Sequence, residues 1–386
     1  MKIKVIASTQ TKGQGVETKE DYDEFSGRVA GICYMSGSFE DLQNEPIEKT
    51  KRRAISTKFS GHHSVFDHEY ISLYIEDVPK LFAMILNNEK IYATSEKSAR
   101  YTIMANCSPI EKELYDKWYE IFIEEISKKY GKNQPFFDEK RIKKLAQENA
   151  RYFLSVLTPT SMVYSTSFRQ LNYLCGWMKS FEESQNLLIK ALAPVAEKFI
   201  ESVKENQLYD ETLSKDNKSR EFSLFAKRKR EECFSENYSI NYKGSFASLA
   251  QAQRHRTLKY EMTQIVPPEY YVPEIIRKNE YLKNEWLEDM KKVEHLHPQA
   301  ELIMINERGT PEDFILKTKE RLCSCAQLEI MRQTQQTLDR YHKETKNKDI
   351  KDMLKDYKRG ARCINPDYIC KNPCGFLGGI TLERDI

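Results

Sequence analysis

The chain has 386 residues, long enough for one large domain or two medium-sized ones with substantial hydrophobic cores. Its 61 basic and 58 acidic residues nearly cancel to a net charge of +3, so the composition implies no bulk polyelectrolyte partner, and we expect no nucleic acid polymer as a partner. No run of 18 apolar residues is present and the first seven residues are too short for a secretory signal, so we expect a cytoplasmic protein with no membrane partner.

The first ninety residues predict short strands and helices. Residues 3–7 predict a strand, and residues 46–54 the opening of a helix. Residues 69–76 alternate apolar and polar side chains, which is typical of a half-buried strand. Residues 80–86 follow as a short buried helix.

A segment rich in histidine, serine and aspartate precedes that strand, over residues 61–68. His62 and His68 lie six residues apart, which is not the spacing of two metal ligands on one helix face. We therefore predict no metal here, and the simplest interpretation is a helix cap followed by packed histidines.

Residues 93–101 carry a second polar cluster. If this stretch is extended, Glu96, Ser98 and Arg100 project from one face, because side chains alternate along a strand. An acceptor, a hydroxyl and a forked cation suit an anionic ligand such as a nucleotide. On spacing alone, a solvated turn with an ion pair is the favoured alternative.

Long helices are predicted after Pro109. Apolar residues recur at helical spacing over residues 114–126, and Asp138 is placed to cap a helix that runs to residue 154. Two further helices are expected over residues 165–177 and 182–203. Residues 205–222 are polar, with few apolar anchors, and predict a connector near the middle of the chain.

The second half opens with the basic cluster 227–230, which we interpret as a solvated helix face because no aromatic residues interleave with it. Residues 238–242 predict a strand, and residues 272–293 a helix. A long helix is expected from Pro311 to about residue 341.

The two halves repeat one order of features: a strand, a short apolar helix, a polar cluster and later helices. This suggests an internal duplication, although self-similarity alone does not establish it. We therefore expect a first unit over residues 1–204, a connector over 205–222, a second unit over 223–345 and a cysteine-containing tail over 346–386.

The motifs of the two halves resemble those of the flavin-dependent thymidylate synthases, as two units in tandem. The first half carries Gly61-His62 with Asp67-His68, where Asp stands for the family's Glu, and Ser95 to Tyr101, where Ser95 stands for Asn. It also carries Ala150-Arg151 to Leu154, with Ser155 in place of Pro, and Arg169, but it lacks Arg-His-Arg. The second half keeps Gln251 to Arg256, with its Arg-His-Arg, and the motif from Arg321 to Ile330, but lacks the Ser-x-Arg-Tyr segment.

The resemblance implies an α+β fold of two tandem units, each a small antiparallel sheet packed with long helices. Enzymes of this family are homotetramers whose sites are assembled between subunits. Because each half keeps the pieces that the other lacks, we expect the halves to act as unlike subunits that build composite sites. We expect a homo-oligomer, most simply a dimer.

The implied reaction converts dUMP to dTMP, with methylenetetrahydrofolate and NADPH as co-substrates and FAD as the cofactor. The resemblance assigns Arg254 and Ser98 to the catalytic group, although no neighbouring base marks Ser98 as a nucleophile. The remaining assignments are substrate binding by Gln251, Glu96, Arg100, Arg151 and Arg321, and flavin binding by His62, Ser64, Asp67, Arg169, His255 and Arg256.

Each assignment has a structural alternative. Arg151 and Arg321 could form structural salt bridges, His62 could be a capped histidine, and the Arg-His-Arg segment could be an exposed basic turn. Two functional alternatives also stay open: a related flavin-dependent one-carbon transfer to another pyrimidine nucleotide, and a non-catalytic nucleotide-binding protein.

The nine cysteines fit reduced thiols or metal ligands better than a disulfide framework. Cys363, Cys370 and Cys374 in the tail, with Cys323 and Cys325 upstream, match no standard zinc or iron–sulfur spacing. The simplest interpretation is reduced, partly buried thiols, and a zinc or iron–sulfur site in the tail stays open as the alternative.

Overall fold

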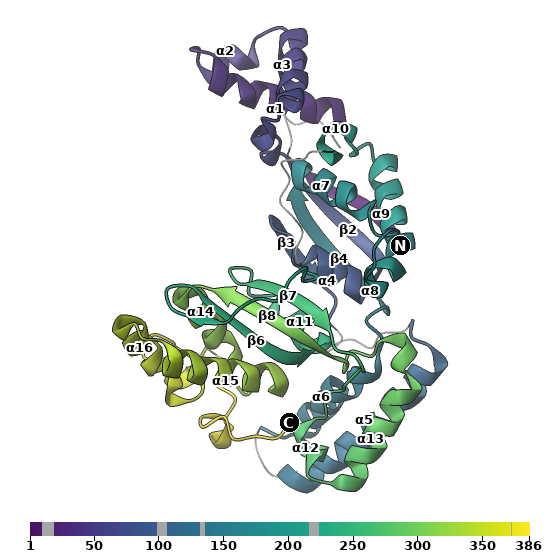
Figure 1. The fold of residues 1–386 in the computed structure, drawn as a ribbon, viewed down its shortest axis with the longest axis vertical. Helices are drawn as coiled ribbons and strands as arrows, with labels where there is room; N and C mark the ends of the chain where they lie inside the picture. Colours follow the sequence, from purple (N-terminus) through teal and green to yellow (C-terminus); the bar gives the residue numbers. More distant parts are fainter. Residues whose placement is uncertain (10–18, 99–105, 132–135, 216–223, 372) are drawn as a thin grey trace. The chain divides into compact units, whose positions relative to one another are not determined.

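The computed structural model describes residues 1–9, 19–98, 106–131, 136–215, 224–371 and 373–386. It divides into two compact units: unit 1 contains residues 1–97 and 159–222, and unit 2 contains residues 98–158 and 223–386. The division differs from the expected one, because residues 98–158 and the tail both cluster with unit 2. Each unit has a four-stranded antiparallel sheet with helices around it (Figure 1), which confirms the α+β class.

The sheet of unit 1 has the strand order β1-β2-β4-β3, with all neighbours antiparallel. Its strands are β1 (Lys2–Ser8), β2 (Tyr70–Pro79), β3 (Tyr92–Glu96) and β4 (Pro159–Ser167). The alternation predicted for β2 is confirmed: Ile71, Leu73 and Ile75 are buried, and the residues between them are not. Strand β4 was not predicted.

The helix expected over residues 165–177 begins only at Phe168. Ser167 caps α7 (Phe168–Met178) by accepting a hydrogen bond from the Gln170 amide, and the residues before it belong to β4. Strand β4 lies between β2 and β3 in the sheet. Every second residue along it is buried: Thr160, Met162, Tyr164 and Thr166.

The other helices of unit 1 are α1 (Lys19–Tyr34), α2 (Phe39–Gln43), α3 (Ile47–Phe59), α4 (Lys80–Leu86), α8 (Leu187–Ala191), α9 (Ala193–Glu205) and α10 (Glu211–Ser214). The first part of the expected connector is structured. Asp210 is buried, caps α10 and accepts a hydrogen bond from the Lys58 ammonium over 2.7 Å. This ion pair and the buried Leu213 hold the segment against unit 1.

The sheet of unit 2 has the order β5-β6-β8-β7, again antiparallel throughout. Its strands are β5 (Cys233–Phe234), β6 (Tyr238–Ser245), β7 (Lys259–Gln264) and β8 (Leu302–Gly309). The two sheets thus share one order of strands. In both, the second and fourth strands run directly into a helix, and a pair of helices separates the third strand from the fourth in sequence.

The helices of unit 2 are α5 (Pro109–Tyr130), α6 (Glu139–Ala150), α11 (Phe246–Ala252), α12 (Glu274–Arg277), α13 (Glu280–Lys292), α14 (Pro311–Arg321), α15 (Leu328–Glu344) and α16 (Lys348–Lys355). Asp138 caps α6 as predicted. The single helix expected from Pro311 to residue 341 is wrong, because residues 322–327 form a turn between α14 and α15. Within the described parts of the chain, no helix is long and apolar enough to cross a membrane.

The hydrophobic core of unit 2 explains why residues 98–158 cluster there. Trp118 on α5 packs edge-to-face against Trp286 on α13, with ring centroids 4.9 Å apart, and Phe153 lies 4.7 Å from the same indole. The Trp118 indole N–H donates to Asp289 over 2.9 Å. Figure 1 shows α5, α6, α12 and α13 gathered at one end of this unit.

Candidate functional site: a basic pocket in unit 2

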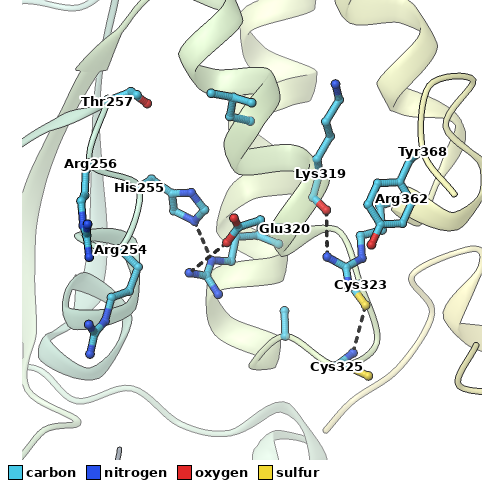
Figure 2. A pocket seen from close by; sticks show the side chains of 13 residues that line it. Arg254, His255, Arg256, Thr257, Lys319, Glu320, Cys323, Cys325, Arg362 and Tyr368 are labelled. Carbon is cyan, nitrogen blue, oxygen red and sulfur yellow. Dashed lines mark hydrogen bonds and ion pairs between the residues drawn. The ribbon is translucent and has the colours of Figure 1, made fainter. Parts of the chain in front are cut away.

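A pocket of about 660 Å³ lies in unit 2 between the turn after α11 and the end of α14. It is lined by Arg254, His255, Arg256, Thr257, Leu316, Lys319, Glu320, Arg321, Cys323, Cys325, Ala326, Arg362 and Tyr368. Figure 2 shows the Arg-His-Arg segment on one side of the pocket, and Lys319, Arg362 and Tyr368 on the other. Four of the residues singled out from sequence therefore meet here: Arg254, His255, Arg256 and Arg321.

The end of α11 positions the Arg-His-Arg segment. Ser245 caps this helix, and the chain leaves it in a turn in which the Arg254 and His255 amides donate to Gln251 and Ala252 carbonyls. The turn ends as β7 begins at Lys259, so the sheet fixes the far side of the segment. His255 is buried, whereas Arg256 is exposed at the mouth of the pocket.

The last turn of α14 supplies Arg321, which ties the two sides together. Its Nε donates to His255 Nε2 over 2.7 Å, and its Nη2 donates to the Gln251 carbonyl over 3.2 Å. Since Nε2 accepts this bond, the imidazole proton lies on Nδ1. Arg321 thus fixes the tautomer and the orientation of His255.

His255 is held neutral by its surroundings. Burial lowers its pKa to about 2, and the positive charges of Arg321 and Lys317 act in the same direction. The imidazole therefore adds no positive charge to the pocket, and its Nδ1–H remains a hydrogen-bond donor over the physiological pH range.

This lowered pKa predicts acid sensitivity. Below pH 6.5 the unfolded chain binds a proton at His255 that the folded chain does not, so stability is lost as the pH falls, by up to about 1.4 kcal/mol per pH unit. We expect a loss of about 2 kcal/mol from this residue between about pH 7.5 and about pH 5. Urea unfolding at several pH values measures it.

The control is His255→Gln, whose amide oxygen can accept from Arg321 but does not titrate. The variant should lose about 2 kcal/mol less stability than the parent over the same pH range. Parallel stability curves for the two proteins would contradict the assignment of a neutral, buried imidazole.

The lining is strongly cationic. It has five basic side chains, Arg254, Arg256, Lys319, Arg321 and Arg362, against the single carboxylate of Glu320. Lys319 also pairs with Asp367 at 2.5 Å, and Arg362 Nη1 donates to the Lys319 carbonyl over 3.0 Å. Guanidinium groups are suited to bidentate binding of phosphate or carboxylate, so the pocket favours an anionic ligand.

A buried polar network lies behind the pocket and includes Arg151. Arg151 and Gln251 both donate to the side-chain oxygen of Gln327, and Gln327 donates in turn to the Tyr152 hydroxyl over 2.5 Å. Tyr152 donates to Glu329 over 2.6 Å. Arg151 is buried and does not line the pocket, so its observed contacts are those of a positioning residue.

Glu329 closes this network against the start of α11. It accepts hydrogen bonds from the Ser245 amide at 2.7 Å and the Ser245 hydroxyl at 2.6 Å. Burial raises the pKa of Glu329, while the bonds from Ser245 and Tyr152 oppose that shift. The Ala-Gln-x-Glu-Ile motif therefore orders α11, which carries Gln251 and leads into the turn with Arg254.

The residues expected on the flavin side lie in unit 1. Asp67 pairs with Arg169 at 2.8 Å and accepts from Ser167 at 2.8 Å, and Arg169 Nε donates to the Tyr173 hydroxyl over 2.6 Å. His62 Nδ1 lies 2.6 Å from the Tyr34 hydroxyl.

Ser64 is exposed. Arg169 and Asp67 form an ion pair within unit 1.

The polar cluster of residues 93–101 is only partly described. The Glu96 carboxylate pairs with Lys80 at 2.5 Å and accepts from Asn87 at 3.1 Å. Ser98 is half-buried just beyond β3, and Arg100 lies outside the described residues.

Sequence reasoning missed Lys319, Arg362 and Tyr368 as lining residues. Lys319 lies two residues before Arg321 on the helix expected from Pro311, and Arg362 and Tyr368 come from the tail, which carried no recognisable motif other than its cysteines. Among the described residues, no three His, Cys, Asp or Glu side chains are grouped as a metal ion requires. All nine cysteines are thiols.

Comparisons with known proteins bear on the class. Residues 16–180 match the family model described as thymidylate synthase complementing protein. Thymidylate synthase X from Helicobacter pylori, solved with FAD and dUMP, aligns with a TM-score of 0.35 and 16% identity over 56% of this chain and 100% of its own. The UMP/dUMP methylase PolB from Streptomyces cacaoi, solved with 5-Br dUMP, aligns with a TM-score of 0.32 and 15% identity over 54% and 96%. No curated protein matches the sequence.

The family match confirms the resemblance for the first half of the chain. The first-half motifs, from Gly61 to Arg169, lie within the matched residues. The match supports the class of a flavin-dependent thymidylate synthase-like methyltransferase.

Proposed function

We propose that this chain methylates dUMP to dTMP, using methylenetetrahydrofolate as the one-carbon donor, NADPH as the reductant and FAD as the cofactor. One observation carries the proposal: Arg254, His255, Arg256 and Arg321 line a single cationic pocket in a chain whose first half matches the family model. A pocket with five basic side chains and one carboxylate suits a nucleotide phosphate.

The donor set of the pocket fits both nucleotide and flavin. Arg254 and Arg321 would bind the phosphate of the nucleotide, and the exposed Arg256 and the His255 Nδ1–H would face the cofactor. Gln251 Oε1 is buried and has no hydrogen-bond partner among the described residues, so it offers an acceptor for the imide N–H of a pyrimidine.

When bound, FAD supplies the hydride chemistry of the reaction. The side chains of this protein bind and orient the nucleotide, and a guanidinium beside the pyrimidine stabilises the negative charge that makes C5 nucleophilic. Positioning of the nucleotide also contributes to the rate, because Arg321 and the Gln327–Glu329 network hold Arg254 and Gln251 on fixed elements.

We further propose that the complete site is a composite of both halves, with Ser98, Glu96 and Arg100 from the first and Gln251 and Arg254 from the second. The common strand order of the two sheets supports an origin as tandem units. The flavin contacts assigned to His62, Ser64, Asp67 and Arg169 belong to the same proposal, as does assembly into a homo-oligomer.

Two measurements test the activity. The purified protein, as isolated or after incubation with FAD, should show a bound-flavin absorption spectrum. It should release tritium from 5-labelled dUMP only when methylenetetrahydrofolate and NADPH are present, and faster than from 5-labelled UMP. A protein that cannot bind FAD would refute the proposal, and faster release from UMP would redirect it to another pyrimidine nucleotide.

The composite site has its own test. Arg100→Ala and Arg254→Ala should each weaken dUMP binding, measured by calorimetry, by about 10- to 100-fold, because both arginines serve one ligand. Parent-like affinity in either variant would refute the composite site while leaving the methylation reaction open.

A further inference from the structure

We propose that Cys323 and Cys325 form a thiol–disulfide exchange site in the wall of the basic pocket, and that its substrates are small anionic disulfides. The methylation reaction assigns no role to either cysteine, and the proposal does not depend on that reaction. It rests on a pair of thiols in one turn, an arginine beside one of them, and the charge of the pocket.

The turn between α14 and α15 brings the two thiols together. The Ala326 amide donates to the Cys323 carbonyl over 2.9 Å, and the Cys325 amide donates to Cys323 Sγ over 3.4 Å. Both side chains line the pocket, and Cys325 is the more exposed of the two (Figure 2). An attacking thiol and a resolving thiol therefore lie in one turn with a single residue, Ser324, between them.

The surroundings distinguish the two sulfur atoms. Arg141 Nη2 lies 3.6 Å from Cys325 Sγ and donates to the Ser324 carbonyl over 3.3 Å. A hydrogen bond from Cys323 lowers the pKa of Cys325 to about 5, and the charge of Arg141 acts in the same direction. The same hydrogen bond and burial raise the pKa of Cys323, so that thiol stays protonated.

The turn is held in place by the end of the chain. Arg384 is buried and donates to the Ala326 carbonyl, and Gly379 approaches Ser324 so closely that a Cβ at that position would collide with its hydroxyl. The Arg362 amide donates to the Leu322 carbonyl over 2.6 Å. The two thiols are thus presented on a supported turn.

The reaction follows from these roles. The Cys325 thiolate attacks one sulfur of a small disulfide, the S–S bond of that disulfide breaks, and one thiolate leaves. Cys323 then loses its proton to solvent and attacks Cys325 Sγ, which releases the second thiolate and forms the Cys323–Cys325 disulfide. The protein loses two electrons and the small disulfide gains them, so the step balances.

The charge of the pocket selects the substrate. Arg254, Arg256, Lys319 and Arg362 surround the turn with positive charge, which attracts carboxylate-bearing disulfides and repels cationic ones. Salt weakens this preference because it screens charges at the mouth of the pocket.

Alkylation of the unmodified protein tests the thiolate. At about pH 6, iodoacetamide should label Cys325 about tenfold faster than the exposed Cys33, Cys233 and Cys363, measured by peptide mass spectrometry. At this pH a thiol of pKa about 5 is mostly ionised, whereas an ordinary thiol of pKa about 8.5 is less than about 1% ionised. The low-pKa thiolate is intrinsically less nucleophilic, which offsets part of the rate gained from its greater ionisation. Labelling no faster than that of the three reference cysteines would overturn the proposal.

Exchange is tested with glutathione disulfide as the anionic probe and cystamine as the cationic one. The parent protein should form the Cys323–Cys325 disulfide, Cys323→Ser should accumulate a glutathione adduct on Cys325, and Cys325→Ser should form neither product. Glutathione disulfide should react faster than cystamine at low salt, and the difference should shrink in high salt. An adduct on Cys323 in Cys325→Ser, or equal rates for both probes at low salt, would overturn the proposal.

Discussion

Replacing Arg254 with alanine is expected to weaken dUMP binding by about 10- to 100-fold, because a charge-assisted hydrogen bond to phosphate contributes about 1.5–3 kcal/mol. Arg254 lines the pocket directly and follows α11, which Ser245 caps. Calorimetric titration of the variant with dUMP measures the effect.

Two further variants serve as matched controls for this result. Arg254→Lys should fall between parent and alanine variant, since the ammonium retains the charge but loses the fork that binds phosphate through two donors. Arg228→Ala removes an exposed arginine of the same unit that does not line the pocket, and it should leave affinity unchanged. Equal losses in Arg254→Ala and Arg228→Ala would show that only the overall charge matters.

Replacing Trp286 with alanine is expected to lower the free energy of unfolding of unit 2 by about 3–5 kcal/mol, the usual cost of removing a large buried aromatic side chain. Its indole is fully buried, contacts Trp118, Phe122 and Phe153, and donates to the Tyr271 carbonyl over 2.9 Å. Urea unfolding monitored by circular dichroism measures the loss.

The control lies on the same helix. Tyr281 is 74% exposed, so Tyr281→Ala should change the free energy of unfolding by no more than about 0.5 kcal/mol. A loss below about 1 kcal/mol for Trp286→Ala would mean that α5 and α13 do not share a core, and would remove the reason given for assigning residues 98–158 to unit 2.

Local patterns predicted the elements that carry strong periodicity or clear caps. The alternation along β2 and the cap at Asp138 are short-range effects, so the sequence identified them. Strand β4 was missed because residues 159–167 are rich in Ser and Thr and run directly into α7 without a turn signal. Strand β8 was missed although Ile303 and Ile305 are buried on one of its faces.

The residues of the pocket were likewise predicted only in part. Arg254, His255, Arg256 and Arg321 were found through motifs, and the structure places them together in one cavity. Arg151 carried a motif as well, yet its contacts are with Gln327 behind the pocket. The break between α14 and α15 was not predicted, because residues 322–327 contain neither Gly nor Pro to interrupt the helical pattern.

The sequence by itself determined the family resemblance, the α+β class and the residues of the Arg-His-Arg motif, because these depend on residue types at short spacing. The tertiary structure alone decided that residues 98–158 join unit 2, that Lys319 and Arg362 line the pocket, and that Arg141 lies beside Cys325. These contacts join residues as many as 184 positions apart along the chain. They depend on which buried faces pack together, and local periodicity does not specify that choice.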